Sequence, residues 1–131
     1  MRFKVTITSD YEGRFSLTSH KELAQLNPKE LMLYSAALCS GLTLDYIAKK
    51  KRVEPSLVEI TVEGELSTAE LMPESIFTRF YVIYRLECMT IEEQRRLSEA
   101  ATLTHEKYCG LMNMLRKIAP INHEISIVSE E

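Results

Sequence analysis

Hydrophobic and polar residues alternate at the start of the chain, near its middle and at its end. Phe3, Val5 and Ile7 alternate with polar residues, and the segment RFSLT repeats the pattern after a turn at DYEG. A period of two is typical of strands with one buried face, so the chain is predicted to open with a β-hairpin. Val58 to Val62 and Phe80 to Cys88 predict two more strands, STAELMPES a loop between them, and HEISIV a closing strand.

Segments with helical patterns separate these strands. NPKE predicts a helix start, with Asn27 as N-cap, Pro28 in the first helical position and Glu30 reaching back to the cap. This helix should run to about Lys50. Thr90 and Glu93 predict the capping box of a second helix, and its apolar stripe comprises Leu97, Ala100, Ala101, Thr104 and Tyr108. LMNMLRKI, after Gly110, predicts a short helix before Pro120.

The order of these elements predicts the fold class. A hairpin, a long helix, two strands, two helices and a last strand indicate a single α+β domain over residues 1–131, with an antiparallel sheet. The first helix is apolar on nearly every side, whereas a small sheet and one amphipathic helix cover only part of such a surface. We therefore expect a partner chain to cover the rest.

Composition and charge exclude several classes of partner. The chain of 131 residues has 45% hydrophobic residues and a net charge of −3, which disfavours binding to nucleic acid or to anionic membranes. The basic run Lys49 to Arg52 suits the negative end of a helix dipole. The apolar run Leu31 to Leu44 is short for a bilayer, and the N-terminus lacks the pattern of a secretory signal. We expect a cytoplasmic protein without a membrane span.

Three cysteines carry the candidate chemistry. They are far apart without a CxxC pair, which argues against a disulfide scaffold and a zinc ribbon. Cys39 lies among small apolar residues, where a free cysteine is usually a buried hydrophobe. Cys88 shares its strand face with Phe80, Val82 and Leu86 and is predicted to be core.

Cys109 stands where one helix ends and another begins. The free N–H groups of a helix N-terminus favour a thiolate, and His105 and Lys107 lie close enough in sequence to add positive charge. His105 and Cys109 are also four residues apart, but no second close pair completes a metal site, so no metal is expected. Thiol chemistry, or no chemistry, remains.

The sequence resembles the OsmC/Ohr family of osmotically induced and organic-hydroperoxide-resistance proteins. The matching segments are NPKELMLYSAALCSGLTLDYIAKKKRV, HEKYCGLMNMLRK and INHEISIV. The pattern comprises a Pro-x-Glu-Leu helix start, a cysteine in mid-helix and a second cysteine that opens a later helix. The match is nearest to the branch with KYC before the second helix.

The resemblance implies an intertwined homodimer and a two-cysteine peroxidase. Cys39 would attack an organic hydroperoxide and become a sulfenic acid, and Cys109 would condense with it to a disulfide. An external dithiol would then reduce the disulfide, so no bound cofactor is expected. Arg14, on the hairpin, is the candidate for the arginine that polarises the peroxide.

Two positions depart from the family pattern. Lys29 stands where the peroxidase branch has a glutamate, ten residues before Cys39, and the neighbouring Glu30 is explained by capping. Ten helical residues span about 15 Å, so the family's glutamate serves the thiol only across a dimer interface. CGLM replaces a cysteine followed by proline. The charges near the thiol should therefore differ from those of the peroxidase branch.

Two alternative functions stay open at the sequence level. A dimer without catalytic activity would bind an apolar small molecule, with the leucine, methionine and tyrosine residues of the first helix lining the cavity. A slow redox sensor would form the same disulfide and differ only in rate and partners.

Overall fold

The computed structural model describes residues 1–10 and 12–131, so Tyr11 of the predicted DYEG turn lies outside the described residues. The strands form one five-stranded sheet in the order β2-β1-β3-β4-β5. The strands are β1 (Arg2–Ser9), β2 (Phe15–Leu17), β3 (Leu57–Leu66), β4 (Phe77–Cys88) and β5 (Ile121–Ser129). The helices are α1 (Pro28–Lys50), α2 (Ile91–Leu103) and α3 (Gly110–Arg116), with a 3₁₀ turn (Leu23–Gln25) and a π-helical turn (Thr104–Tyr108).

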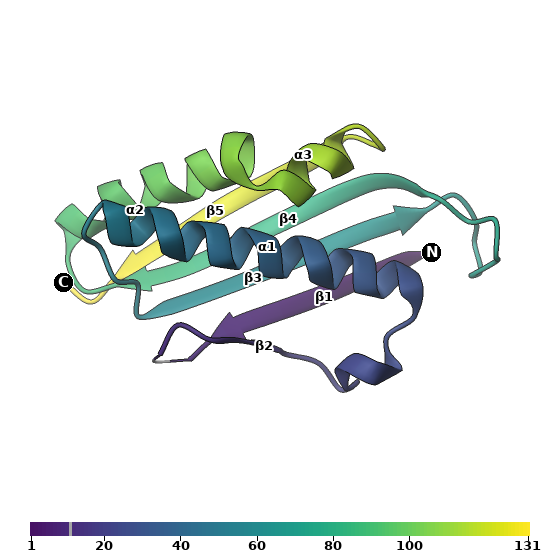
Figure 1. Ribbon diagram of the computed structural model, residues 1–131, viewed down its shortest axis with the longest axis horizontal. Helices are drawn as coiled ribbons and strands as arrows, with labels where there is room; N and C mark the ends of the chain where they lie inside the picture. The colour runs from purple at the N-terminus through teal and green to yellow at the C-terminus, as the bar shows by residue number, and fades with distance from the viewer. Residues whose placement is uncertain (11) are drawn as a thin grey trace.

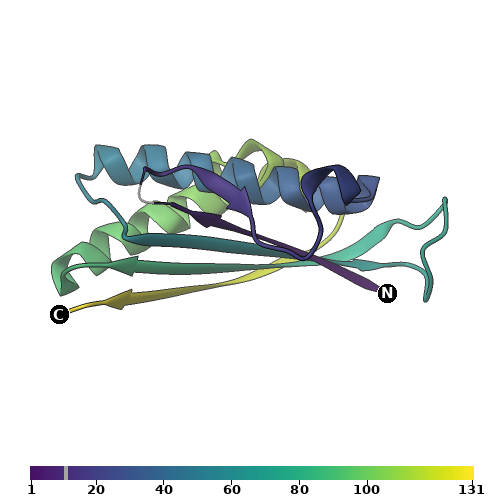
Figure 2. The same ribbon diagram turned by 90° about the horizontal axis from the view of Figure 1, so that it is seen from below.

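The helices lie over one face of the sheet, giving the two layers seen edge-on in Figure 2. The α+β class and the predicted hairpin are confirmed, since β1 and β2 pair antiparallel with Ile7 opposite Leu17. On β4, every second residue from Phe80 to Cys88 is buried, so this face carries the core under the helices. Cys88 is fully buried there, as predicted.

The sheet is not wholly antiparallel, which corrects one expectation. β5 pairs with β4 in parallel, with Phe80 opposite Ile121 and Cys88 opposite Ser129 (Figure 1). The reason is the crossover through α2, the π-helical turn and α3, which returns the chain to the beginning of β4 before β5 starts. β3 pairs antiparallel with β1 on one side and with β4 on the other, as expected.

Helix α1 begins and ends as the sequence predicts. The Asn27 side chain accepts a hydrogen bond from the Glu30 N–H at 2.9 Å, and the Glu30 carboxylate accepts one from the Asn27 N–H at 3.0 Å. The helix is long and apolar enough to cross a bilayer, but its inner side packs on β1 and β3 in the manner of a core helix.

The outer side of α1 is apolar and uncovered in the single chain. Leu42 is 56% exposed and Tyr46 is 61% exposed, and Leu31 and Met32 on the same helix are also exposed. This agrees with the nearly all-round apolar character read from the sequence. The uncovered side extends along the helix in Figure 1, facing away from the sheet.

Candidate active site

Two thiols meet beneath the middle of α1. Cys39 is half-buried on α1, whereas Cys109, between the π-helical turn and α3, is fully buried. Both are free thiols, and they lie close enough for Cys39 to act on the pKa of Cys109 through direct side-chain interaction. The more accessible sulfur of Cys39 therefore has the fully buried sulfur of Cys109 beside it.

The π-helical turn places Cys109 in the core. The Cys109 N–H donates to the Thr104 carbonyl oxygen at 3.0 Å, a bond across five residues, where an α-helix would span four. The extra residue in this turn changes which side chains face inward. Thr104 and His105 are buried, while Tyr108 is 54% exposed. The predicted membership of Tyr108 in the apolar stripe of α2 is wrong, because α2 ends at Leu103.

Burial outweighs the expected effect of the helix N-terminus on Cys109. Burial raises the pKa of the Cys109 thiol and Cys39 adds to the rise, whereas hydrogen bonds with the Ser40 hydroxyl and the Met112 N–H oppose it. The Ser40 hydroxyl lies 3.3 Å from Cys109 Sγ. The Met112 N–H in the first turn of α3 favours the thiolate, as expected of a helix N-terminus, but burial away from water is the larger effect, so the pKa of Cys109 is raised.

His105 is buried and neutral, which corrects the positive charge expected near Cys109. Burial, together with the nearby His123 and Arg116, lowers the pKa of His105 to about 4. Its Nδ1 lies 2.9 Å from the Tyr84 hydroxyl oxygen on β4. Burial also raises the pKa of Tyr84, so its hydroxyl stays protonated. His105 serves as a hydrogen-bonding group in this site.

Arg116 fixes the π-helical turn from α3. Its two terminal nitrogens lie 3.0 and 2.7 Å from the His105 carbonyl oxygen, and one of them also binds the Glu106 carbonyl oxygen at 3.2 Å. The carbonyl groups that a widened turn leaves without helical partners are satisfied in this way. Arg116 was not predicted from the sequence as part of the site.

Lys107 and Arg14 do not reach the thiols in the single chain. The Lys107 ammonium lies 5.2 Å from the centroid of the Tyr108 ring at the surface. The exposed Arg14 guanidinium binds Asp10 at 3.2 Å and Glu12 at 3.1 Å in its own turn. Within residues 1–10 and 12–131, no ion pair or hydrogen bond joins Arg14 to a cysteine.

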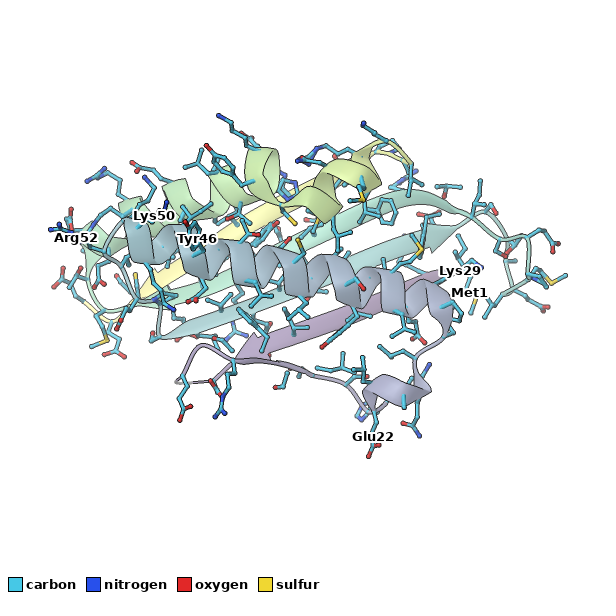
Figure 3. The ribbon with its side chains drawn as sticks, in the orientation of Figure 1. Met1, Glu22, Lys29, Tyr46, Lys50 and Arg52 are labelled. Atoms are coloured by element: carbon cyan, nitrogen blue, oxygen red, sulfur yellow. The ribbon has the colours of Figure 1, made fainter. Side chains whose placement is uncertain are left out.

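Lys29 and Glu30 occupy the first turn of α1. Figure 3 shows Lys29 at the end of α1 opposite to Tyr46 and Lys50. The buried Glu30 carboxylate caps the helix and binds the Lys21 ammonium at 3.1 Å, while Lys29 is half-exposed beside the loop of Leu71 and Met72. Glu30 acts as a cap, as predicted, and Lys29 lies away from the thiols of its own chain.

An apolar groove opens beside the π-helical turn. Leu42, Tyr46, Ile47 and Tyr108 contribute to its lining, and it encloses about 600 Å³. The Lys50 ammonium lies 4.7 Å from the centroid of the Tyr46 ring at one side of this groove. The exposed ring of Tyr108 thus lines this groove, and Tyr108 directly precedes Cys109 in the chain.

Ser40 and Tyr84 were also missed by the sequence analysis, although each leaves a signal in the pattern. Tyr84 falls at an inward position of β4 between Val82 and Leu86, where a hydroxyl needs a partner. Ser40 lies on the buried side of α1 with Ala36 and Ala37. A polar atom at each inward position indicates a buried polar contact, but only the fold shows that Ser40 binds Cys109 and Tyr84 binds His105.

Comparison with known proteins assigns the fold to a family. The family model described as OsmC-like protein matches residues 19–124. The chain belongs to the OsmC-like family. No curated protein matches the sequence.

Solved structures share the OsmC-like fold over most of the chain. A hypothetical protein from Aquifex aeolicus is 25% identical, with 100% of both chains covered and a TM-score of 0.67. An OsmC-like protein from Mycoplasma pneumoniae is 16% identical over 98% of this chain and 96% of that one, with a TM-score of 0.64. An organic hydroperoxide resistance protein OsmC from Legionella pneumophila is 19% identical over 85% and 74% of the two chains, with a TM-score of 0.55.

Proposed function

We propose that this OsmC-like protein is a thiol peroxidase that reduces organic hydroperoxides with two cysteines. The observation that carries the proposal is the pairing of a half-buried Cys39 with a fully buried Cys109 close enough to interact with it. The family supports the substrate class, since its structural neighbours include an organic hydroperoxide resistance protein from Legionella pneumophila.

The proposed reaction begins at Cys39. Its thiolate attacks the distal oxygen of the hydroperoxide, the O–O bond breaks, and the alkoxide takes up a proton and leaves as an alcohol. Cys39 becomes a sulfenic acid. Cys109 then attacks the oxidised sulfur, water leaves, and a Cys39–Cys109 disulfide forms. An external dithiol reduces this disulfide, so the cycle uses no bound cofactor or metal.

The active form is proposed to be a homodimer in a reducing compartment, the cytoplasm. The uncovered apolar side of α1, with Leu42 and Tyr46, would be shielded by a second copy. Arg14 is proposed to polarise the O–O bond of the peroxide. In the dimer its guanidinium would leave Asp10 and Glu12 and turn toward the thiols. Lys29 and Glu30 would then influence the charge of the site from the partner's helix.

A count of thiols tests this proposal. The protein receives one equivalent of cumene hydroperoxide per subunit, and remaining thiols are alkylated under denaturing conditions and counted by intact mass. We expect the loss of two alkylatable thiols, mapped by digestion to a Cys39–Cys109 bridge, and no bridge in Cys39→Ser. Three unchanged thiols in the wild type would contradict the proposal.

A second candidate function rests on the apolar groove of Leu42, Tyr46 and Tyr108. A pocket of this size with few polar groups suits an apolar small molecule, and the protein would then be a binding module without catalysis. Native mass spectrometry of freshly purified protein should show a retained ligand or saturable fatty-acid binding. A redox sensor with the same disulfide would oxidise once and turn over slowly.

A further inference from the structure

Ser40 places a hydroxyl group in the core beside the two thiols. It directly follows Cys39 on α1 and is fully buried on the side of the helix that carries Ala36 and Ala37. A buried hydroxyl costs free energy unless it has a hydrogen-bond partner. This hydroxyl donates to Cys109 Sγ, 3.3 Å away. The reaction proposed above assigns no role to Ser40.

A backbone group meets the same sulfur from another element. The Met112 N–H, in the first turn of α3, also hydrogen-bonds to Cys109. Within residues 1–10 and 12–131, Ser40 and this N–H are the two groups that lower the pKa of Cys109 against burial. The other titratable or charged groups near the sulfur are Cys39 from α1, Tyr84 from β4, His105 from the π-helical turn, Arg116 from α3 and His123 from β5. Of the two donors, only the serine hydroxyl is removed by a side-chain substitution.

The hydrogen bond from Ser40 favours one protonation state of Cys109. A thiol sulfur is a weak acceptor, whereas a hydrogen bond to an ionised acceptor is roughly twice as strong as one to a neutral acceptor. The thiolate is also the form that attacks another sulfur, and burial disfavours it at Cys109. A donor that binds the thiolate more strongly than the thiol therefore lowers the barrier to this attack.

We propose that the Ser40 hydroxyl donates its hydrogen bond to the thiolate of Cys109 while that thiolate attacks the oxidised Cys39. The inference rests on the proposed function and adds a residue to its second step. Cys39 and Ser40 are neighbours on α1, and both interact with Cys109. One turn of the helix thus supplies the sulfur that is attacked and the donor that holds the attacking sulfur.

The step balances with Ser40 as a donor only. The S–H bond of Cys109 and the S–O bond of the Cys39 sulfenic acid break, and the S–S bond forms. The proton of Cys109 joins the hydroxide that leaves Cys39 and gives water. The Cys109 sulfur is oxidised and the Cys39 sulfur is reduced, so the step needs no further oxidant. Ser40 keeps its own proton throughout.

A test with Ellman's reagent follows the attack of Cys109 without any peroxide. An excess of the reagent converts the half-buried Cys39 to a mixed disulfide, and Cys109 then displaces the yellow thionitrobenzoate anion in a second phase. We expect Ser40→Ala to slow the second phase by about tenfold at pH 7 while the first phase is unchanged, because the thiolate loses a donor. The matched control is Ser98→Ala, since Ser98 is an exposed serine of α2 and should retain both rates.

Titration of the cysteines by nuclear magnetic resonance separates thiolate stabilisation from packing. The chemical shift of a ¹³C-labelled Cβ atom reports the ionisation of each cysteine as the pH is raised from 8 to 10.5. In Ser40→Ala the titration curve of Cys109 should move about one pH unit higher, whereas Cys88 should titrate as in the wild type. A serine that only packs against the sulfur would change the rate without moving this curve.

A wild-type second phase in Ser40→Ala, or a slower one with an unmoved titration curve of Cys109, would overturn the inference. Both measurements omit peroxide, so they decide the role of Ser40 separately from the proposed function, which fails if hydroperoxide leaves all three thiols unchanged. Alanine is a better helix former than serine, and thermal unfolding of Ser40→Ala checks that the fold is retained.

Discussion

Cys88 and Cys109 are equally buried, but their surroundings differ. Cys88 lies at the end of β4, where its thiol donates only to the Thr90 carbonyl oxygen at 3.5 Å among the described contacts. Cys109 lies between Ser40 and Cys39. Burial raises the pKa of both thiols, so neither is reactive by its own acidity. The chemical role proposed for Cys109 therefore rests on its partners, Ser40 and Cys39, which Cys88 lacks among the described contacts.

The largest expected effect is on peroxidase activity, which should depend on Cys39 and not on Cys88. Cys39→Ser should lower kcat/KM for cumene hydroperoxide by at least about a thousandfold, because the proposed nucleophile is lost. Cys88→Ala should retain activity within about twofold on the same reasoning. A steady-state assay with a dithiol reductant measures both. Equal turnover in Cys39→Ser and wild type would show that the thiol pair is no more important for activity than Cys88.

The pH dependence of stability should sharpen the comparison next. The pKa of folded His105, about 4, lies below its ordinary value of 6.5, so the neutral form stabilises the fold above pH 6.5. As the pH falls from 6.5 toward 4 the unfolded chain binds the proton first, and the free energy of unfolding decreases. The decrease should be about 2 kcal/mol between pH 7 and pH 5.

Urea denaturation at the two pH values measures this decrease. His105→Gln should remove most of it, whereas His20→Gln provides the matched control because His20 is exposed. An identical decrease in His105→Gln and wild type would show that the buried His105 is not the group whose titration lowers the stability.

The smallest expected effect concerns packing at the two buried cysteines. Cys88→Ala should lower the free energy of unfolding by about 1 kcal/mol through loss of the sulfur contacts. Cys109→Ala should cost about 1 kcal/mol more, since the buried Ser40 hydroxyl loses its hydrogen bond to the sulfur. Urea titration compares the two variants, and a larger loss at Cys88 would reverse the proposed difference.

Local signals in the sequence predicted much of the fold. The Asn27 and Glu30 pair and the Thr90 and Glu93 pair mark helix starts through contacts within four residues, and both capping boxes are present. The alternation on β4 likewise predicted the burial of Cys88. Such features depend on neighbours in the chain, which is why the pattern alone reveals them.

Features that depend on distant packing were not predictable. The parallel pairing of β5 requires the path of the whole crossover, and the neutral state of His105 requires its burial in the core, with His123 and Arg116 brought beside it. The outward position of Tyr108 follows from one widened turn, which the hydrophobic periodicity of the sequence does not predict. The family resemblance supplied the pairing of Cys39 with Cys109, which spacing could not.

The widened turn also makes the site sensitive to length. A residue advances an α-helix by about 100°, so a deletion of one residue between Thr104 and Tyr108 would let α2 continue in its original phase. The side chains after the deletion would then rotate to new faces without any change in their identity. Whether the two sulfurs lie close together thus depends partly on the number of residues in this turn. In an alignment of relatives, a gap at this turn would mark chains in which the residue aligned with Cys109 has different surroundings.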